Sequence, residues 1–384
     1  MVERQLPKLN VTGSIPVSRS KRLVIDPRST KHPSVLGPSP AGNAAYSAEL
    51  FSIHREGTEM RFTPARWMFF TLIAAAIVLL SSSPLPAQTS APTRPRITGI
   101  SHVGYFVSDL PKSIAFWHDF LGFDESYNLK TPGTDQVSIA FIKINDRQHI
   151  ELFNQAPTNP PNRMSHLCLT VDNVEQMRVY LRSKGFDVEP GNGGRTRAGD
   201  YAFEIKDPDG TLLEFVQTLP TGMEAQNAGK FMPSTRVADA IYHVGFLVGN
   251  SEKSIAFYHN VLGFREIWRG ASQPDELSWI NMQVPDGTDY VEFMLYRTLP
   301  TTFGTKNHAS LVVPDIQKAV ATLEARPAFK EYGKPLSVQV GKNGKRQVNI
   351  YDPDGTRVEL MEAHTVDGKI VPPSTAPPPP PLHQ

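Results

Sequence analysis

Four stretches of this chain repeat one order of apolar and polar positions. Each begins with an alternating strand, continues with a helix whose apolar residues recur at helical spacing, and ends in short alternating strands. In the first stretch, residues 100–107 predict the strand, residues 110–121 an amphipathic helix ended by Gly122, and residues 149–153 the last strand. Each stretch is therefore predicted to form a β-α-β-β-β unit of roughly 55 residues.

The four units form two similar pairs, at residues 97–153, 163–217, 240–297 and 305–362. His243 follows His102 by 141 residues, and Glu292 follows Glu151 by the same 141 residues. A repeat period this long indicates a duplicated domain in which each half is built from two similar units. The sequence thus predicts an α+β fold with two domains of cupped, antiparallel or mixed sheets, at residues 97–220 and 240–364, joined by a linker at 221–239.

The same turn precedes the last strand of the second and fourth units. Asp-Pro-Asp-Gly occupies residues 207–210 and 352–355, where Pro sets one φ and Gly accepts the positive φ that closes the turn. In each strand that follows, a glutamate stands four residues after the glycine, at Glu214 and Glu359. A carboxylate among apolar strand residues needs a partner, because burying a lone charge costs several kcal/mol.

A histidine in the first strand and a glutamate in the last strand recur in all four units. Because strand side chains alternate between two faces, the two can meet on the concave side of a curled unit. Two facing units then offer two imidazoles and two carboxylates to one point. One such histidine alone is usually structural, but the pairing of both types in every unit favours a divalent metal, namely Zn, Ni, Co, Mn or Fe. The eight candidate ligands are His102, Glu151, His166, Glu214, His243, Glu292, His308 and Glu359.

Other candidate donors lack this repetition. His118, His149 and His259 have no counterpart in all four units, so we expect them at the surface or supporting the ligands. Cys168 follows His166 by two residues and is expected to face the same cavity as a small apolar residue. As the only cysteine, it excludes a disulfide or a thiolate metal cluster within one chain.

The ends of the chain differ in composition from the units. Residues 1–59 are rich in Ser, Pro and basic residues and are expected to be disordered or not translated, and residues 88–96 are a linker. Residues 67–80, within 60–87, form an apolar run of 14 residues that follows Arg61 and Arg66. A membrane span needs about 20 residues, so this run predicts a cleaved signal peptide, with a membrane anchor as the alternative. We therefore expect an exported protein, periplasmic or extracellular, with a disordered, proline-rich tail at 365–384.

The formal net charge is +1 and the chain has no basic stripe, so nucleic acid is not expected as a partner. A small-molecule substrate is expected instead, bound by a monomer or a homodimer. Contact with a membrane is expected only through residues 67–80, if the signal is not cleaved.

The repeated motifs resemble those of the vicinal-oxygen-chelate superfamily, which includes glyoxalase I, extradiol dioxygenases, fosfomycin-resistance enzymes and bleomycin-binding proteins. The resemblance rests on His-Val-Gly with Ser-Ile-Ala-Phe and Leu-Gly-Phe downstream, at 102–123 and 243–264, and on the two Asp-Pro-Asp-Gly-Thr segments. It implies that two units enclose one metal, held by the first-strand His and last-strand Glu of each. It also implies that Glu214 or Glu359 acts as general base in glyoxalase-like lyase or isomerase chemistry through an enediolate or oxyanion.

Two other functions stay open. An extradiol Fe(II) dioxygenase uses two His and one Glu, but the further His and Tyr of those enzymes have no counterpart here; Glu204 and Asn349 stand at the Tyr positions. The other alternative is a non-catalytic exported binding protein. The resemblance also leaves the pairing of units open, as one with two and three with four, or as one with four and two with three. The second scheme gives the metal sets His102/Glu151/His308/Glu359 and His166/Glu214/His243/Glu292.

Overall fold

Two eight-stranded sheets form the body of the protein in a computed structural model that describes residues 91–156, 162–188, 194–300 and 306–380. The strands of the first sheet are β1 (Ile97–Val107), β2 (Glu125–Lys130), β3 (Val137–Asn145), β4 (Gln148–Asn154), β5 (Met164–Val171), β6 (Gly194–Arg195), β7 (Tyr201–Lys206) and β8 (Leu212–Gln217). Those of the second are β9 (Ala240–Val248), β10 (Arg265–Gly270), β11 (Trp279–Gln283), β12 (Tyr290–Leu295), β13 (His308–Val313), β14 (Gln339–Val340), β15 (Lys345–Tyr351) and β16 (Arg357–Thr365).

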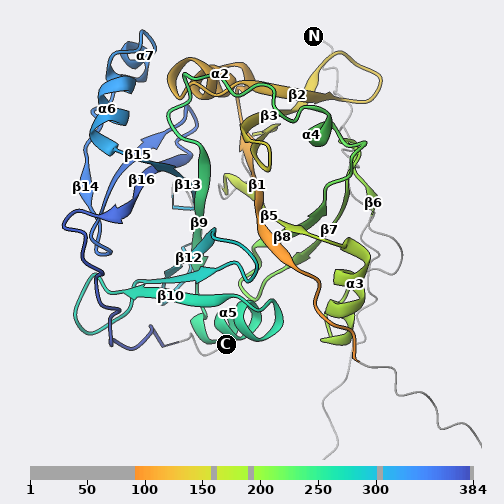
Figure 1. The fold of residues 1–384 in the computed structure, drawn as a ribbon, viewed down its shortest axis with the longest axis vertical. Helices are drawn as coiled ribbons and strands as arrows, with labels where there is room; N and C mark the ends of the chain where they lie inside the picture. Colours follow the sequence, from red (N-terminus) through yellow and green to blue (C-terminus); the bar gives the residue numbers. More distant parts are fainter. Residues whose placement is uncertain (1–90, 157–161, 189–193, 301–305, 381–384) are drawn as a thin grey trace, which may run out of the picture. The chain divides into compact units, whose positions relative to one another are not determined.

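Both sheets have the same order, β2-β3-β4-β1-β5-β8-β7-β6 and β10-β11-β12-β9-β13-β16-β15-β14. Two units join at the centre of each sheet, where β1 runs antiparallel to β5 and β9 antiparallel to β13. Within each unit the first and last strands are parallel neighbours, such as β1 and β4 or β13 and β16. The structure confirms the predicted α+β fold, with one curled, mixed sheet for each predicted domain. Both sheets appear in Figure 1.

Helices connect the first and second strands of each unit. They are α2 (Leu110–Ala115) with the π-helical turn η1 (Phe116–Phe120), α3 (Val174–Ser183), α5 (Ser251–Ile255) with η2 (Ala256–Val261), and α6 (Ile316–Glu324), with the short helices α4 (Met223–Gln226) and α7 (Phe329–Tyr332) in connections. The Asp109 side chain accepts a hydrogen bond from the Lys112 N–H (3.2 Å), which caps the start of α2. Gly122 follows η1 with φ +82°, a conformation that favours glycine, so the helix ends where the sequence predicts.

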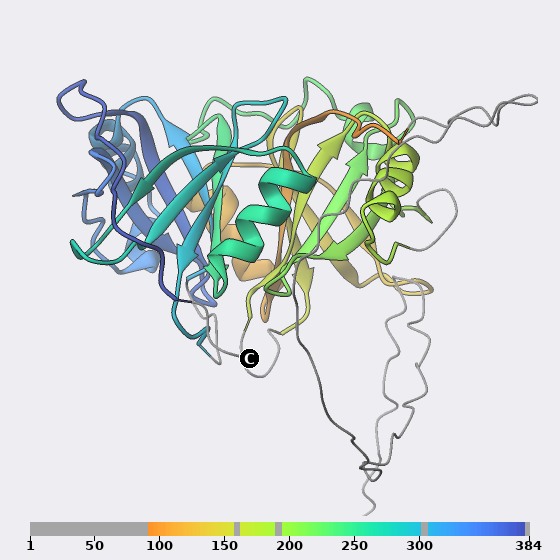
Figure 2. The same cartoon turned by 90° about the horizontal axis from the view of Figure 1, so that it is seen from below.

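Helices at two places join the half of the chain that forms the first sheet to the half that forms the second. Tyr258 on η2 donates a hydrogen bond to Asp207 Oδ2 (3.2 Å), and Ser254 on α5 donates to Asp209 Oδ2 (2.9 Å). On the other side, the Phe120 ring stacks on Tyr332 at a centroid distance of 4.6 Å. Units two and three, and units one and four, are therefore in contact through helices, and the two sheets lie side by side in Figure 2.

Both Asp-Pro-Asp-Gly segments form the predicted turn. The glycines Gly210 and Gly355 have φ of +88° and +79°. The first aspartate of each turn receives a backbone N–H: Asp207 Oδ1 from Thr211 (2.8 Å) and Asp352 Oδ1 from Thr356 (2.7 Å). Each turn thus fixes the entry of the strand that carries Glu214 or Glu359.

The C-terminal tail is not the unpacked segment that its proline content predicts. The Ser374 N–H donates to the Arg269 carbonyl and the Leu277 N–H to the Pro377 carbonyl, both at 2.9 Å. Ala376 is 8% exposed. The expectation of disorder from residue 365 onward was wrong over the described part. An extended proline-rich chain can still pair its remaining backbone groups, here with Arg269 of β10 and with Leu277 in the segment before β11.

The segments predicted as an extension and as a signal or anchor, residues 1–59 and 60–87, lie outside the described residues. Among the helices of the described ranges, none is long and apolar enough to cross a membrane.

Candidate metal centres

The first sheet gathers four predicted ligands on one face. Nε2 of His102 (β1) lies 3.0 Å from Nε2 of His166 (β5), and Glu214 Oε2 (β8) lies 3.3 Å from the former and 3.1 Å from the latter. Glu151 (β4) is slightly farther, with its oxygens 3.7 and 3.6 Å from the same two nitrogens. Ligands about 2.1 Å from one ion lie about 3.0–3.4 Å apart at octahedral or tetrahedral angles. This set, the first centre, therefore fits a divalent ion.

Serine hydroxyls orient both imidazoles of the first centre. Ser101 Oγ lies 3.1 Å from His102 Nδ1, and Ser165 Oγ lies 3.2 Å from His166 Nδ1. When Nδ1 carries the proton and donates it to the hydroxyl, the Nε2 lone pair is left for a metal. The histidines are 4% and 3% exposed, so these lone pairs face the other donors and not bulk water.

The carboxylates of the first centre favour a positive charge at this place. Burial lowers the pKa of His102, and the nearby Glu151 carboxylate only partly offsets this. Burial also acts to lower the pKa of His166, but the Glu214 and Glu151 carboxylates outweigh it and raise that pKa to about 9. Burial alone would raise the pKa of Glu214, yet hydrogen bonds from His102 and His166 hold it well below its usual range. Ionised oxygens that already stabilise a positive charge here are suited to a metal.

Two further residues reach the first centre, and neither belongs to the repeated pattern. The His149 ring stacks on His102 at a centroid distance of 4.5 Å, and its Nε2 lies 3.6 Å from Glu151 Oε1. Glu224 Oε2, on α4, lies 3.4 Å from His149 Nδ1. The sequence placed His149 at the surface or behind the ligands, and its register two residues before Glu151 supports the second position. No motif marked Glu224, because it lies in the connector after the last strand.

The second sheet gathers the other four predicted ligands, which form the second centre. His243 Nε2 and His308 Nε2 are 3.3 Å apart, Glu359 Oε1 is 3.5 Å from His243, and Glu292 Oε2 is 3.7 Å from His308. The spacing is wider than in the first centre. Ser310 stands where the first sheet has Cys168, and its Oγ donates to Glu359 Oε1 (3.0 Å).

Arg357 adds a cation to the second centre. Its Nη2 lies 3.2 Å from His308 Nε2. Burial lowers the pKa of both His243 and His308, and the Arg357 charge lowers both further. Burial and the neighbouring Glu359 raise the pKa of Glu292. Compared with the first centre, the second therefore favours neutral imidazoles and a protonated carboxyl group.

Each candidate ligand set comes from a single sheet. His102 and Glu151 meet His166 and Glu214, and not the residues of unit four. The pairing of unit one with four and of two with three therefore does not describe the ligand sets. Hydrogen bonds between β1 and β5 place units one and two in the first sheet, and those between β9 and β13 place units three and four in the second. Cys168 is fully buried in β5 opposite His102, and burial raises its pKa well above the usual value.

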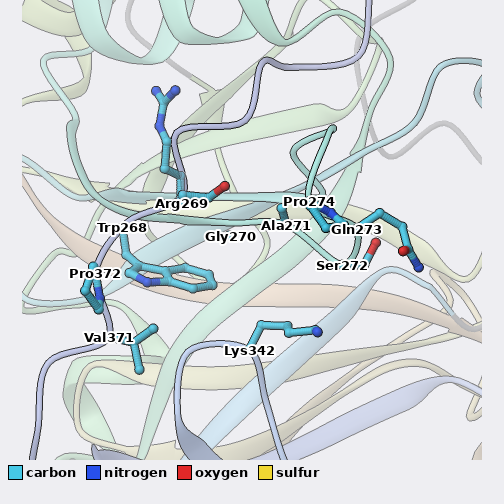
Figure 3. A pocket seen from close by; sticks show the side chains of 11 residues that line it. Trp268, Arg269, Gly270, Ala271, Ser272, Gln273, Pro274, Lys342, Val371 and Pro372 are labelled. Atoms are coloured by element: carbon cyan, nitrogen blue, oxygen red, sulfur yellow. The ribbon is translucent and has the colours of Figure 1, made fainter.

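A pocket of about 290 Å³ lies where the C-terminal tail crosses β10. Trp268, Lys342 and Val371 line it, and Figure 3 shows the Arg269 guanidinium pointing away from the Trp268 ring. Trp268 pairs in register with Asn281, which pairs with Glu292, so the pocket borders the face that carries the second centre.

Comparison with known proteins agrees with this geometry. The sequence profile of the glyoxalase/bleomycin resistance protein/dioxygenase superfamily matches residues 99–215 and 240–360. The chain belongs to this superfamily. The match covers both sheets and confirms the resemblance drawn from the motifs.

Relatives within the superfamily include two kinds of enzyme. A lactoylglutathione lyase of Arabidopsis thaliana is 23% identical over 276 residues, which cover 68% of this chain and 90% of the relative. A 2,2',3-trihydroxybiphenyl dioxygenase of Sphingomonas paucimobilis is 31% identical over 122 residues, 31% of this chain and 40% of the relative.

Solved structures share the fold. The Mn(II)-bound glyoxalase of Novosphingobium aromaticivorans aligns with a TM-score of 0.52 at 20% identity, covering 74% of this chain and 89% of the other. A substrate complex of homoprotocatechuate 2,3-dioxygenase from Brevibacterium fuscum aligns with a TM-score of 0.51 at 16% identity, covering 71% and 82%. At these identities the likeness shows the fold alone.

Proposed function

We propose that this protein is a divalent-metal-dependent enzyme of glyoxalase-like type, acting on a small oxygenated substrate at the first centre. The observation that carries the proposal is the convergence of His102 Nε2, His166 Nε2 and Glu214 Oε2 within 3.0–3.3 Å of one another. Glu151 completes an N₂O₂ set. A divalent ion bound there would supply a Lewis acid that polarises a carbonyl oxygen and stabilises an enediolate or oxyanion.

The chain's own side chains then position the substrate and move its proton. Glu214 is the carboxylate that the family resemblance designates as general base, and it can act at a carbon next to the polarised carbonyl. Glu151, held less closely by the imidazoles, is the second candidate for that role. His149 and Glu224 keep Glu151 and His102 in place from behind, so we assign them a positioning role.

The substrate class follows from the chemistry and from the predicted location. We propose a 2-oxoaldehyde adduct or another α-hydroxycarbonyl compound, since its two neighbouring oxygens could both bind an ion held by His102, His166 and Glu214. Because residues 60–87 predict export, we propose an adduct other than that of glutathione, which is scarce outside the cytoplasm.

The test is metal binding followed by turnover in the full-length protein. After removal of bound metal and reconstitution with Mn(II), Ni(II), Co(II) or Zn(II), we expect binding at the first centre and metal-dependent isomerisation of oxoaldehyde–thiol adducts. His102→Ala should abolish both, while the exposed His118→Ala should leave both intact. Absence of binding with every metal would refute the proposal.

An extradiol dioxygenase is the second candidate, favoured by one observation. The three closest donors, His102, His166 and Glu214, form a two-histidine, one-carboxylate set, which is the set used by many Fe(II) oxygenases. Oxygen uptake by the Fe(II)-loaded protein in the presence of catechols separates this candidate from the first, since isomerisation consumes no oxygen.

A further inference from the structure

The duplicated motif has an apolar residue in the first centre where the second centre has an arginine. The segment Gly-Thr-Leu-Leu-Glu leads to Glu214, whereas Gly-Thr-Arg-Val-Glu leads to Glu359. Leu212 and Arg357 therefore occupy the same place, two residues before the glutamate and on the same face of the strand. Arg357 pairs in register with His308, so its side chain starts beside a candidate ligand.

The Arg357 guanidinium is held against that ligand. Nη2 contacts His308 Nδ1, lies 3.2 Å from His308 Nε2, and donates to the Lys306 carbonyl at 3.0 Å. It also lies 3.6 Å from Met294 Sδ. Arg357 Nε is buried and has no hydrogen-bond partner among the described residues. The guanidinium is thus packed into the centre, not extended into solvent.

This placement conflicts with metal binding in two ways. If His308 Nδ1 donates its proton to the Lys306 carbonyl (3.0 Å), the remaining Nε2 lone pair lies 3.2 Å from the Arg357 Nη2 donor. If Nδ1 instead accepts from Arg357, the proton is on Nε2, which then has no lone pair for a metal. A guanidinium keeps its charge at any ordinary pH, so a divalent ion would lie within a few ångströms of a permanent positive charge. His243, His308 and Glu359 could hold an ion by spacing alone, and Arg357 is the residue that argues against it.

A second difference points the same way. Glu359 is tied to Ser310 by a hydrogen bond of 3.0 Å, while Glu214 has Cys168 as its strand neighbour and instead contacts both imidazoles. Glu359 Oε1, which accepts this bond, lies 3.5 Å from His243 Nε2, farther than Glu214 Oε2 lies from either imidazole of the first centre.

We propose that Arg357 excludes a metal ion from the second centre, so that each chain holds its ion at the first centre alone. This inference rests on the proposed metal-dependent function. It assigns the duplicated domains different roles: one carries the metal, and the other is a copy whose ligand positions are closed by a side-chain cation.

The experiment is a reciprocal exchange of the two residues, read by elemental analysis of the full-length protein after reconstitution with Mn(II) and dialysis. The wild-type protein should retain about one equivalent per chain, Arg357→Leu about two, and Leu212→Arg close to none. Arg357→Lys keeps a positive charge and should remain at about one. Circular dichroism establishes that each variant is folded.

Ligand variants keep the test decisive if an exchange variant fails to fold. His308→Ala in the wild-type background should leave the single equivalent in place, and His102→Ala should remove it. Two equivalents in the wild-type protein, falling to about one in His308→Ala, would overturn the inference while leaving the proposed function intact. One equivalent in Arg357→Leu would also overturn it. No metal in the wild-type protein would refute the proposed function itself.

Discussion

Replacing Asp352 by asparagine is predicted to stabilise the protein at neutral pH but not in acid. Asp352 opens the second Asp-Pro-Asp-Gly turn, is 3% exposed, and accepts the Thr356 N–H at 2.7 Å. Burial raises the pKa of this carboxyl group from 3.8 to about 6, against the lowering effect of the Thr356 hydrogen bond. Asparagine keeps the Oδ1 acceptor and the size but has no charge to bury.

The magnitude follows from the pKa shift. The raised pKa means that the folded state binds a proton more tightly than the unfolded state does. The stability from that proton is fully present below about pH 4 and is lost as the pH rises through about 6. A shift of about two units corresponds to about 3 kcal/mol, which is the upper limit of the gain from Asp352→Asn above about pH 7. In the acid range the two proteins should have nearly equal stability.

The assay is urea unfolding of the metal-free protein at several pH values from about 4 to about 8, followed by circular dichroism. The quantity measured is the unfolding free energy of Asp352→Asn minus that of the wild type. This difference should rise as the pH increases from about 4 and should level off above about pH 7. Asp367→Asn, at a side chain that is 60% exposed, is the matched control and should change stability by less than about 0.5 kcal/mol. A constant difference between variant and wild type at every pH would refute the reasoning.

Three further predictions concern the first centre and the tail. Glu214→Gln should weaken Mn(II) binding by more than about 100-fold, because the ligand loses its charge while the side chain keeps its shape. Calorimetric titration measures the affinity, and an unchanged value would exclude Glu214 as a ligand. Glu224→Gln should weaken Mn(II) binding by about 10-fold through loss of the charged contact with His149 Nδ1. An affinity equal to that of the wild type would refute the positioning role of Glu224. Truncation after Thr365 removes the hydrogen bonds of Ser374 and Pro377 and should lower the unfolding free energy by about 1–3 kcal/mol, whereas truncation after residue 380 should not; thermal unfolding distinguishes them.

The sequence alone determined the units and the residues on their concave faces. Strand alternation and helix periodicity are local, so three features could be predicted. They are the first and last strands of each unit, the turns at Asp207 and Asp352, and the shared concave face of the first-strand His and the last-strand Glu. Repetition of His and Glu at nearly constant spacing supplied the eight candidate ligands. Arg357 also lies on the predicted face, two residues before Glu359, but its closeness to His308 depends on how two strands pair.

The tertiary structure decided which distant residues contact one another. The choice between the two unit pairings depends on which strands hydrogen-bond at the centre of each sheet. The backbone N–H and C=O groups of β1 and β9 are the same whichever strand pairs with them, so the local sequence does not reveal the partner. Glu224 reaches His149 because the connector after β8 folds back over the first sheet, a contact between residues 75 positions apart that no periodicity encodes. The tail likewise packs because Arg269 of β10 and Leu277 pair their backbone groups with it. Contacts between distant segments are set by the packing of the whole chain, and the chemistry of both centres rests on such contacts.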